Sequence, residues 1–131
     1  MLGRAVASET VNGVTYWSVP PARVRRTPVQ AATPVVHLLP NYDELMNALR
    51  DRGLFQDPAA QLPADAFLRF PHQLAIDGLL RGAWRRTLTN RGIIITVRPF
   101  KPLSRPEKRA LDDEITRYGR FANATATLAI A

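Results

Sequence analysis

The architecture of this protein is set by residues Gln73–Arg98, QLAIDGLLRGAWRRTLTNRGIIITVR. Asp77-Gly78 is a dipeptide that two-residue type I′ turns prefer, so Gln73–Ile76 and Leu79–Leu88 are expected to form a β-hairpin. A short link then leads into Ile93–Arg98, where three adjacent isoleucines are typical of a strand covered on both faces. The stretch therefore predicts a three-stranded antiparallel meander.

A helix and a last strand are expected after the meander. Ser104 with Glu107 forms a capping box, and the helix that begins there should run to about Phe121. Its apolar side is formed by Leu111, Ile115, Tyr118 and Ala122. Its outer side carries charge pairs at i, i+4 spacing, typical of a solvated surface: Lys108/Asp112, Arg109/Asp113 and Asp113/Arg117. The alternating tail Thr125–Ile130 predicts a strand that rejoins the sheet.

A strand and a second helix are expected before the meander. Val35–Leu39 is a short apolar run ended by Pro40, which favours a buried strand. Asn41 and Glu44 then make a capping box, and a helix ending near Gly53 follows from the apolar spacing of Tyr42, Leu45, Met46 and Leu49. Three prolines within residues 56–71 predict a loop there.

The amino-terminal part predicts an isolated hairpin and a connector. Asn12-Gly13 lies between the β-favouring runs Val6–Val11 and Val14–Val19. Four prolines among residues 20–34 permit neither a helix nor a central strand. The predicted fold class is α+β, a mostly antiparallel, barrel-like sheet with two main helices. The segments are a hairpin at 1–20, a connector at 21–34 and an α+β domain at 35–131.

Composition and charge limit the class of function. The 131 residues include no cysteine, which excludes disulfides and thiolate sites, and no run is apolar enough to span a membrane. We expect a soluble, cytoplasmic protein that does not associate with a membrane. Residues 81–120 contain eleven basic and four acidic residues, which accounts for the whole formal net charge of +7. Arginine-rich charge of this kind favours a nucleic-acid partner, although basic proteins are also arginine-rich merely for solubility.

No catalytic, metal or cofactor site is expected. His37 and His72 are far apart, with no cysteine or carboxylate at a metal-ligand spacing, and His37 fits a hydrogen-bonded core histidine. Asp43-Glu44 is explained by helix capping, and Asp112-Asp113-Glu114 by the charge pairs of the helix. Neither a glycine-rich phosphate loop nor a Ser/His/Asp set is recognisable.

One constellation points to ligand binding. On a strand, Arg81 and Arg85 share a face about 13 Å apart at about 3.3 Å per residue, a spacing that reaches separate phosphates. The predicted nucleic-acid-binding set is Arg81, Arg85, Arg86, Arg98 and Lys101. The alternative is that the arginine stems merely cover the strand around a core Trp84.

Five blocks of the sequence carry a family resemblance: Glu9–Trp17, Val36–Glu44 with Arg50–Arg52, Ile76–Gly78, Gly82–Arg86 and Val97–Leu103. In this order they resemble the carboxy-terminal third of winged helix DNA-binding domain-containing proteins, the AlkZ-like superfamily of DNA glycosylases. The resemblance implies a β-rich region that follows tandem winged helices, in which the 1–20 hairpin is the wing of a missing winged helix.

The family's catalytic motif, Gln-x-Gln or Gln-x-Asp, lies near the amino terminus of the full-length proteins. Gln30, Gln56, Gln61 and Gln73 do not match it, so no catalytic residue carries over. We therefore expect a truncated, non-enzymatic, DNA-binding or DNA-positioning module whose partner is double-stranded DNA. The alternative is a structural remnant that self-associates as a homo-oligomer.

Overall fold

The computed structural model describes residues 6–19, 33–44 and 52–131. The chain divides into two compact units, Met1–Gln30 and Ala31–Ala131, and each is described here by itself. Among the helices of the described ranges, none is long and apolar enough to cross a lipid bilayer.

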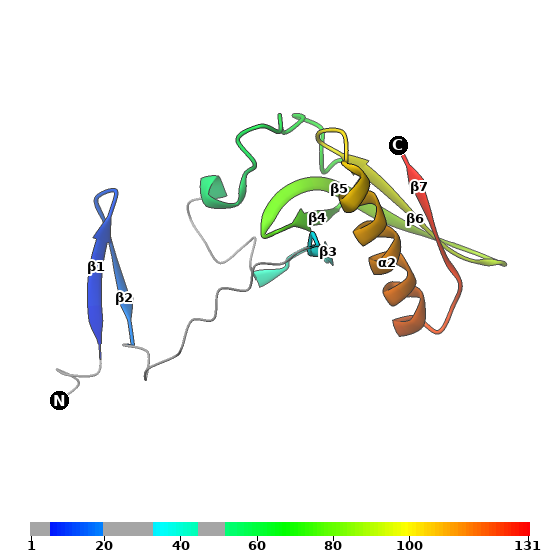
Figure 1. Cartoon of the computed structure of the whole chain (residues 1–131), viewed down its shortest axis with the longest axis horizontal. Helices are drawn as coiled ribbons and strands as arrows, with labels where there is room; N and C mark the ends of the chain where they lie inside the picture. Colours follow the sequence, from blue (N-terminus) through cyan, green and yellow to red (C-terminus); the bar gives the residue numbers. More distant parts are fainter. Residues whose placement is uncertain (1–5, 20–32, 45–51) are drawn as a thin grey trace. The chain divides into compact units, whose positions relative to one another are not determined.

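The first unit contains the predicted hairpin (Figure 1). Strands β1 (Ala7–Val11) and β2 (Val14–Ser18) pair antiparallel, with Glu9 opposite Tyr16. Asn12 and Gly13 take positive φ angles of 50° and 78°, the pair of left-handed conformations that a type I′ turn needs. The hairpin prediction is confirmed.

The second unit is built on a five-stranded sheet of order β3-β4-β5-β6-β7. Its strands are β3 (Val36–Leu39), β4 (His72–Ile76), β5 (Leu79–Thr89), β6 (Gly92–Pro99) and β7 (Ala126–Ile130). Neighbouring strands are antiparallel except β6 and β7, which are parallel. The meander β4-β5-β6 and the rejoining strand β7 are confirmed, with Asp77 and Gly78 at φ 52° and 78° in the predicted turn.

Helix α2 (Arg105–Phe121) packs on one face of this sheet (Figure 1). The predicted capping box is present: Ser104 accepts from the Glu107 N–H, and the Glu107 carboxylate accepts from the Ser104 N–H at 2.7 Å. Leu111 and Ile115 are buried against the sheet, as their spacing predicts. The sheet side of this core contains Leu74, Ile76, Trp84, Ile95 and Val97.

The predicted loop, residues 56–71, follows the short 3-10 helix η1 (Arg52–Phe55). It meets β5 on the face away from α2, where the Phe70 ring lies beside Arg85. Ala83 is fully buried on this face, because neighbours along a strand point to opposite sides and Trp84 points toward α2. From the loop, Ala66 and Phe70 are also buried, and Phe67 meets Phe100 edge to face at 6.1 Å. The loop therefore buries some of its own apolar residues outside the main core.

Several expectations are wrong. The sheet is not a closed barrel, because β3 and β7 are its two unpaired edges. The expectation of two main helices is not confirmed: α2 is the one complete α-helix of the described ranges, and although Glu44 is helical, residues 45–51 lie outside those ranges. Tyr42, at φ 67°, is not helical, so no helix begins directly after Asn41 as expected. His37 is exposed on the edge strand β3, not a core histidine. The isoleucines of β6 alternate, with Ile93 and Ile95 buried and Ile94 half-buried, because only one face meets α2.

Candidate nucleic-acid interface

The five predicted site residues come from β5, β6 and the segment that follows, and they do not form one surface. Arg81 is 7% exposed. It lies at a β-bulge, because Leu74 pairs with Gly82 and Ala75 with Leu80, so that Arg81 has no partner on β4. A bulge changes the direction of a side chain. Arg81 and Arg85 therefore do not form the regular row that strand alternation predicts.

Arg81 is held between two carboxylates. Its Nε lies 3.2 Å from Asp57 Oδ2, and its Nη1 lies 2.8 Å from Glu107 Oε1. Lys101 binds the same Asp57 oxygen at 2.5 Å. The hydrogen bond from Lys101 lowers the pKa of Asp57 below its ordinary value, and a hydrogen bond from the Ala59 N–H adds to this effect. Burial acts in the opposite direction but is outweighed. These ion pairs connect the loop, β5 and the first turn of α2.

Arg98 also has an acidic partner. Its Nη1 lies 3.2 Å from Asp65 Oδ1 and 3.3 Å from Oδ2, and this hydrogen bond lowers the pKa of Asp65. Both side chains remain partly exposed, at 31% and 55%. The roles of Asp57 and Asp65 were not predicted from the sequence. Residues 78–106 contain no acid, so any partner of a buried Arg81 had to come from outside that stretch.

Arg85 and Arg86 are exposed and point to opposite faces of β5. The Arg85 guanidinium lies 5.2 Å from the centre of the Phe70 ring, on the side of the loop. Arg86 Nη1 donates to the Tyr118 hydroxyl at 3.0 Å, on the side of α2. Within the described residues neither has a carboxylate partner. The exposed Arg91, in the turn between β5 and β6, shares this property.

We call residues 85–96, the outer part of the β5–β6 hairpin, the basic ribbon. It contains Arg85, Arg86 and Arg91 and no acidic residue. The residues of β5 within it are all exposed, and its turn projects beyond α2 (Figure 1). The structure thus separates the predicted set into Arg81, Arg98 and Lys101, which form ion pairs, and two exposed arginines.

The ion pair that the structure shows within α2 differs in spacing from the expected i, i+4 pairs. Arg117 binds Glu114, three residues earlier, through Nε at 2.6 Å and Nη2 at 2.7 Å. This contact raises the pKa of Arg117. No group of three or more potential metal-binding side chains occurs in the part of the chain that the structure describes.

Comparison with known proteins agrees with the resemblance. Residues 3–121 match the family described as "DNA glycosylase AlkZ-like". The structure is similar to Streptomyces sahachiroi DNA glycosylase AlkZ, with a TM-score of 0.52 and 16% sequence identity. The similarity covers 99% of this chain and 34% of that one, so the chain spans about a third of the length of that glycosylase. No curated protein matches the chain significantly. Because the family match extends over most of its length, the chain belongs to the AlkZ-like DNA glycosylase family.

Proposed function

We propose that this chain is a DNA-binding module that positions double-stranded DNA within an AlkZ-like glycosylase, and that the basic ribbon contacts the phosphate backbone. The observation that carries the proposal is the exposure of Arg85, Arg86 and Arg91, none of which has a carboxylate partner in the described residues. A guanidinium without a counter-charge is free to bind a phosphate in two-point geometry. The family match makes DNA the polyanion to expect.

The ion-paired residues have a secondary part in this proposal. Arg98 and Lys101 keep 31% of their side chains exposed, so they add to the positive field along the sheet. Arg81 is too buried to reach a phosphate, and we assign it a structural role. We assign no catalytic step to the chain, because the described carboxylates with shifted pKa values all bind arginine, lysine or capping groups.

The salt dependence of DNA binding tests the proposal. Removing one phosphate-binding side chain should lower the slope of log Kobs against log salt by about 0.9. Arg85→Ala combined with Arg86→Ala should therefore lower the slope by about one to two. Fluorescence anisotropy of a labelled duplex, between about 50 and 200 mM salt, measures it.

The matched control removes two exposed cations from α2 instead, Lys108→Ala with Arg109→Ala. This variant should keep the slope of the unchanged protein. Equal effects of the two double variants would show generic attraction to a basic protein. Absence of duplex binding, together with an oligomer in light scattering, would favour the alternative of a self-associating structural module.

A further inference from the structure

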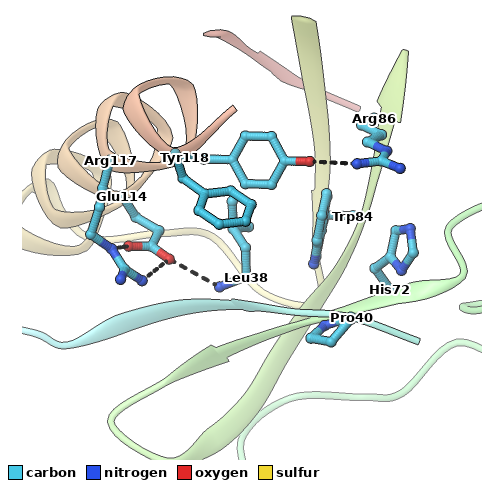
Figure 2. A pocket seen from close by; sticks show the side chains of 9 residues that line it. Leu38, Pro40, His72, Trp84, Arg86, Glu114, Arg117 and Tyr118 are labelled. Carbon is cyan, nitrogen blue, oxygen red and sulfur yellow. Dashed lines mark hydrogen bonds and ion pairs between the residues drawn. The ribbon is translucent and has the colours of Figure 1, made fainter. Parts of the chain in front are cut away.

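A cavity of about 510 Å³ opens between α2 and the sheet (Figure 2). Its volume falls within the range of about 300–1,000 Å³ that is usual for small-molecule sites. Aromatic side chains and two arginines contribute to its lining: His72, Trp84, Tyr118, Phe121, Arg86 and Arg117. The DNA-binding proposal does not account for this combination.

Aromatic rings contribute to the wall of the cavity. The Trp84 ring lies 4.5 Å from the His72 ring and 5.9 Å from the Tyr118 ring, centre to centre. Trp84 Nε1 donates to the carbonyls of Leu39 and Gln73, at 3.0 and 3.1 Å. These bonds fix the indole and satisfy its N–H, so its ring offers apolar contact. Such a surface favours a planar aromatic ligand.

The charge of the cavity favours an anion. Glu114 is balanced by Arg117, which binds both of its oxygens (Figure 2). Arg86 donates one N–H to Tyr118 and has no carboxylate partner in the described ranges. A guanidinium has five N–H groups, so Arg86 keeps donors for a ligand. The lining therefore holds one unbalanced positive charge.

His72 supplies a neutral donor. Its Nδ1 accepts from the Asn41 N–H at 2.9 Å, so Nε2 carries the ring proton. Burial, together with the charge of Arg86, lowers the pKa of His72. The imidazole is therefore uncharged at neutral pH and does not add to the positive charge of Arg86.

We propose that this cavity binds a planar aromatic anion, with its ring against Trp84 and Tyr118 and its negative group on Arg86. A neutral apolar occupant would leave Arg86 without a counter-charge, and an inorganic anion would leave the aromatic surfaces uncovered. A nucleotide and an aromatic carboxylate share this chemistry. The site goes beyond backbone binding by the ribbon, since it recognises a ring and not only a phosphate.

NMR titration of the full chain tests the proposal, with 2-naphthoate and its neutral counterpart 2-naphthalenemethanol as probes. Naphthoate should shift the indole N–H signal of Trp84, but not that of Trp17, and should saturate. The neutral alcohol should bind at least about tenfold more weakly, because it lacks a charge-assisted hydrogen bond to Arg86. Displacement of naphthoate by 5′-dAMP would identify a nucleotide as the anion. If 5′-dAMP does not displace naphthoate, the anion is an aromatic acid.

Two pairs of variants give matched controls. Arg86→Gln should abolish the preference for naphthoate over the alcohol, whereas Arg91→Gln, at an exposed arginine outside the cavity, should keep it. Phe121→Ala should weaken the binding of both probes, whereas Leu88→Ala should weaken the binding of neither. The two side chains are 88% and 71% exposed, so neither change should unfold the protein.

Three results would overturn the proposal: no saturable shift of Trp84, equal affinity for the acid and the alcohol, or an unchanged preference in Arg86→Gln. Arg86 belongs to both proposals, so Arg85→Ala alone separates the two tests: it should weaken duplex binding and leave naphthoate binding intact.

Discussion

Arg81 shows how a single side chain can connect three segments of the molecule. It is almost fully buried, and its guanidinium bridges Asp57 in the loop and Glu107 in α2. Burying a guanidinium costs solvation free energy, which the two carboxylates offset. Removing the arginine leaves both carboxylates with less compensation in a poorly solvated place. The unit Ala31–Ala131 should therefore depend strongly on this residue.

We predict that Arg81→Met lowers the free energy of unfolding by about 3 kcal/mol at neutral pH, the lower end of the range for broken buried ion pairs. Urea denaturation measures the change. Arg91→Met, at an exposed arginine in the β5–β6 turn, is the control and should stay within about 0.5 kcal/mol. A destabilisation by Arg81→Met no larger than that of the control would mean that the ion pairs contribute little.

The ion pairs of Arg81 should also make stability depend on pH. The hydrogen bond from Lys101 lowers the pKa of Asp57. Burial alone would raise the pKa of Glu107, but its hydrogen bonds with Ser104 and the positive charge of Arg81 outweigh burial, so the pKa of Glu107 is also lowered. A carboxylate whose pKa is lowered by folding stabilises the fold at pH values above its ordinary pKa, which is 3.8 for Asp57 and 4.5 for Glu107. This stabilisation is lost as the pH falls through the lowered pKa. The stability gap between the unchanged protein and Arg81→Met should thus narrow from about pH 5 to about pH 3. A constant gap would show that the carboxylates do not act through Arg81.

The role of Arg81 could not be predicted from sequence, and a binding role for Arg85 and Arg86 stays a prediction. Strand alternation placed Arg81 on the same face of the strand as Arg85, but the bulge at Arg81 removes it from that regular row. Its partners are distant in sequence, and no local pattern marks such a pair. The sequence therefore indicates the charge of this region but not how much of that charge is neutralised.

At the scale of elements, local signals were reliable where a turn or a cap is fixed by neighbouring residues. The turns at Asn12-Gly13 and Asp77-Gly78 and the capping box at Ser104 all form as predicted. The capping pattern at Asn41 failed, since the Asn41 N–H binds His72 and Tyr42 takes a positive φ. A tertiary contact there overrides the local preference.

Gly119 of α2 gives a test at this scale, because local and tertiary effects have opposite signs. Alanine in a helix is favoured over glycine by about 1 kcal/mol. A Cβ at Gly119 would, however, lie 2.8 Å from the Ala124 carbonyl oxygen and 3.2 Å from the Ala126 Cβ. Overpacking of this kind costs about 1–3 kcal/mol, so Gly119→Ala should lower the melting temperature. Thr116→Ala on the exposed side of α2 is the control, and stabilisation by Gly119→Ala would contradict the close approach of α2 and β7.

At the scale of the whole molecule, the sequence predicted the elements better than their arrangement. The strands of 35–131 were found, but a barrel was expected where the sheet is open. Closure depends on whether β3 and β7 meet, and no residue pattern within either strand specifies that. The parallel pairing of β7 with β6 likewise depends on the path of α2 across the sheet.

The cavity is also a property of the whole unit. Its lining comes from four elements: Leu38 of β3, His72 of β4, Trp84 of β5 and Tyr118 of α2. No one of these residues, taken alone in the sequence, indicates a cavity. The apolar face of α2 predicted that Tyr118 packs inward, but not that space remains beside it. The assignment of the 1–20 hairpin as a wing stays a prediction.

If the basic ribbon lies against duplex DNA, its backbone amides should respond to DNA more than any others in the chain. An NMR titration of the isotope-labelled protein with a short duplex at low salt follows each amide separately. We expect the largest shifts within residues 85–96, and we expect them to fade as salt is added. Saturating DNA binding that leaves these amides unchanged would show that the ribbon is not the contact surface.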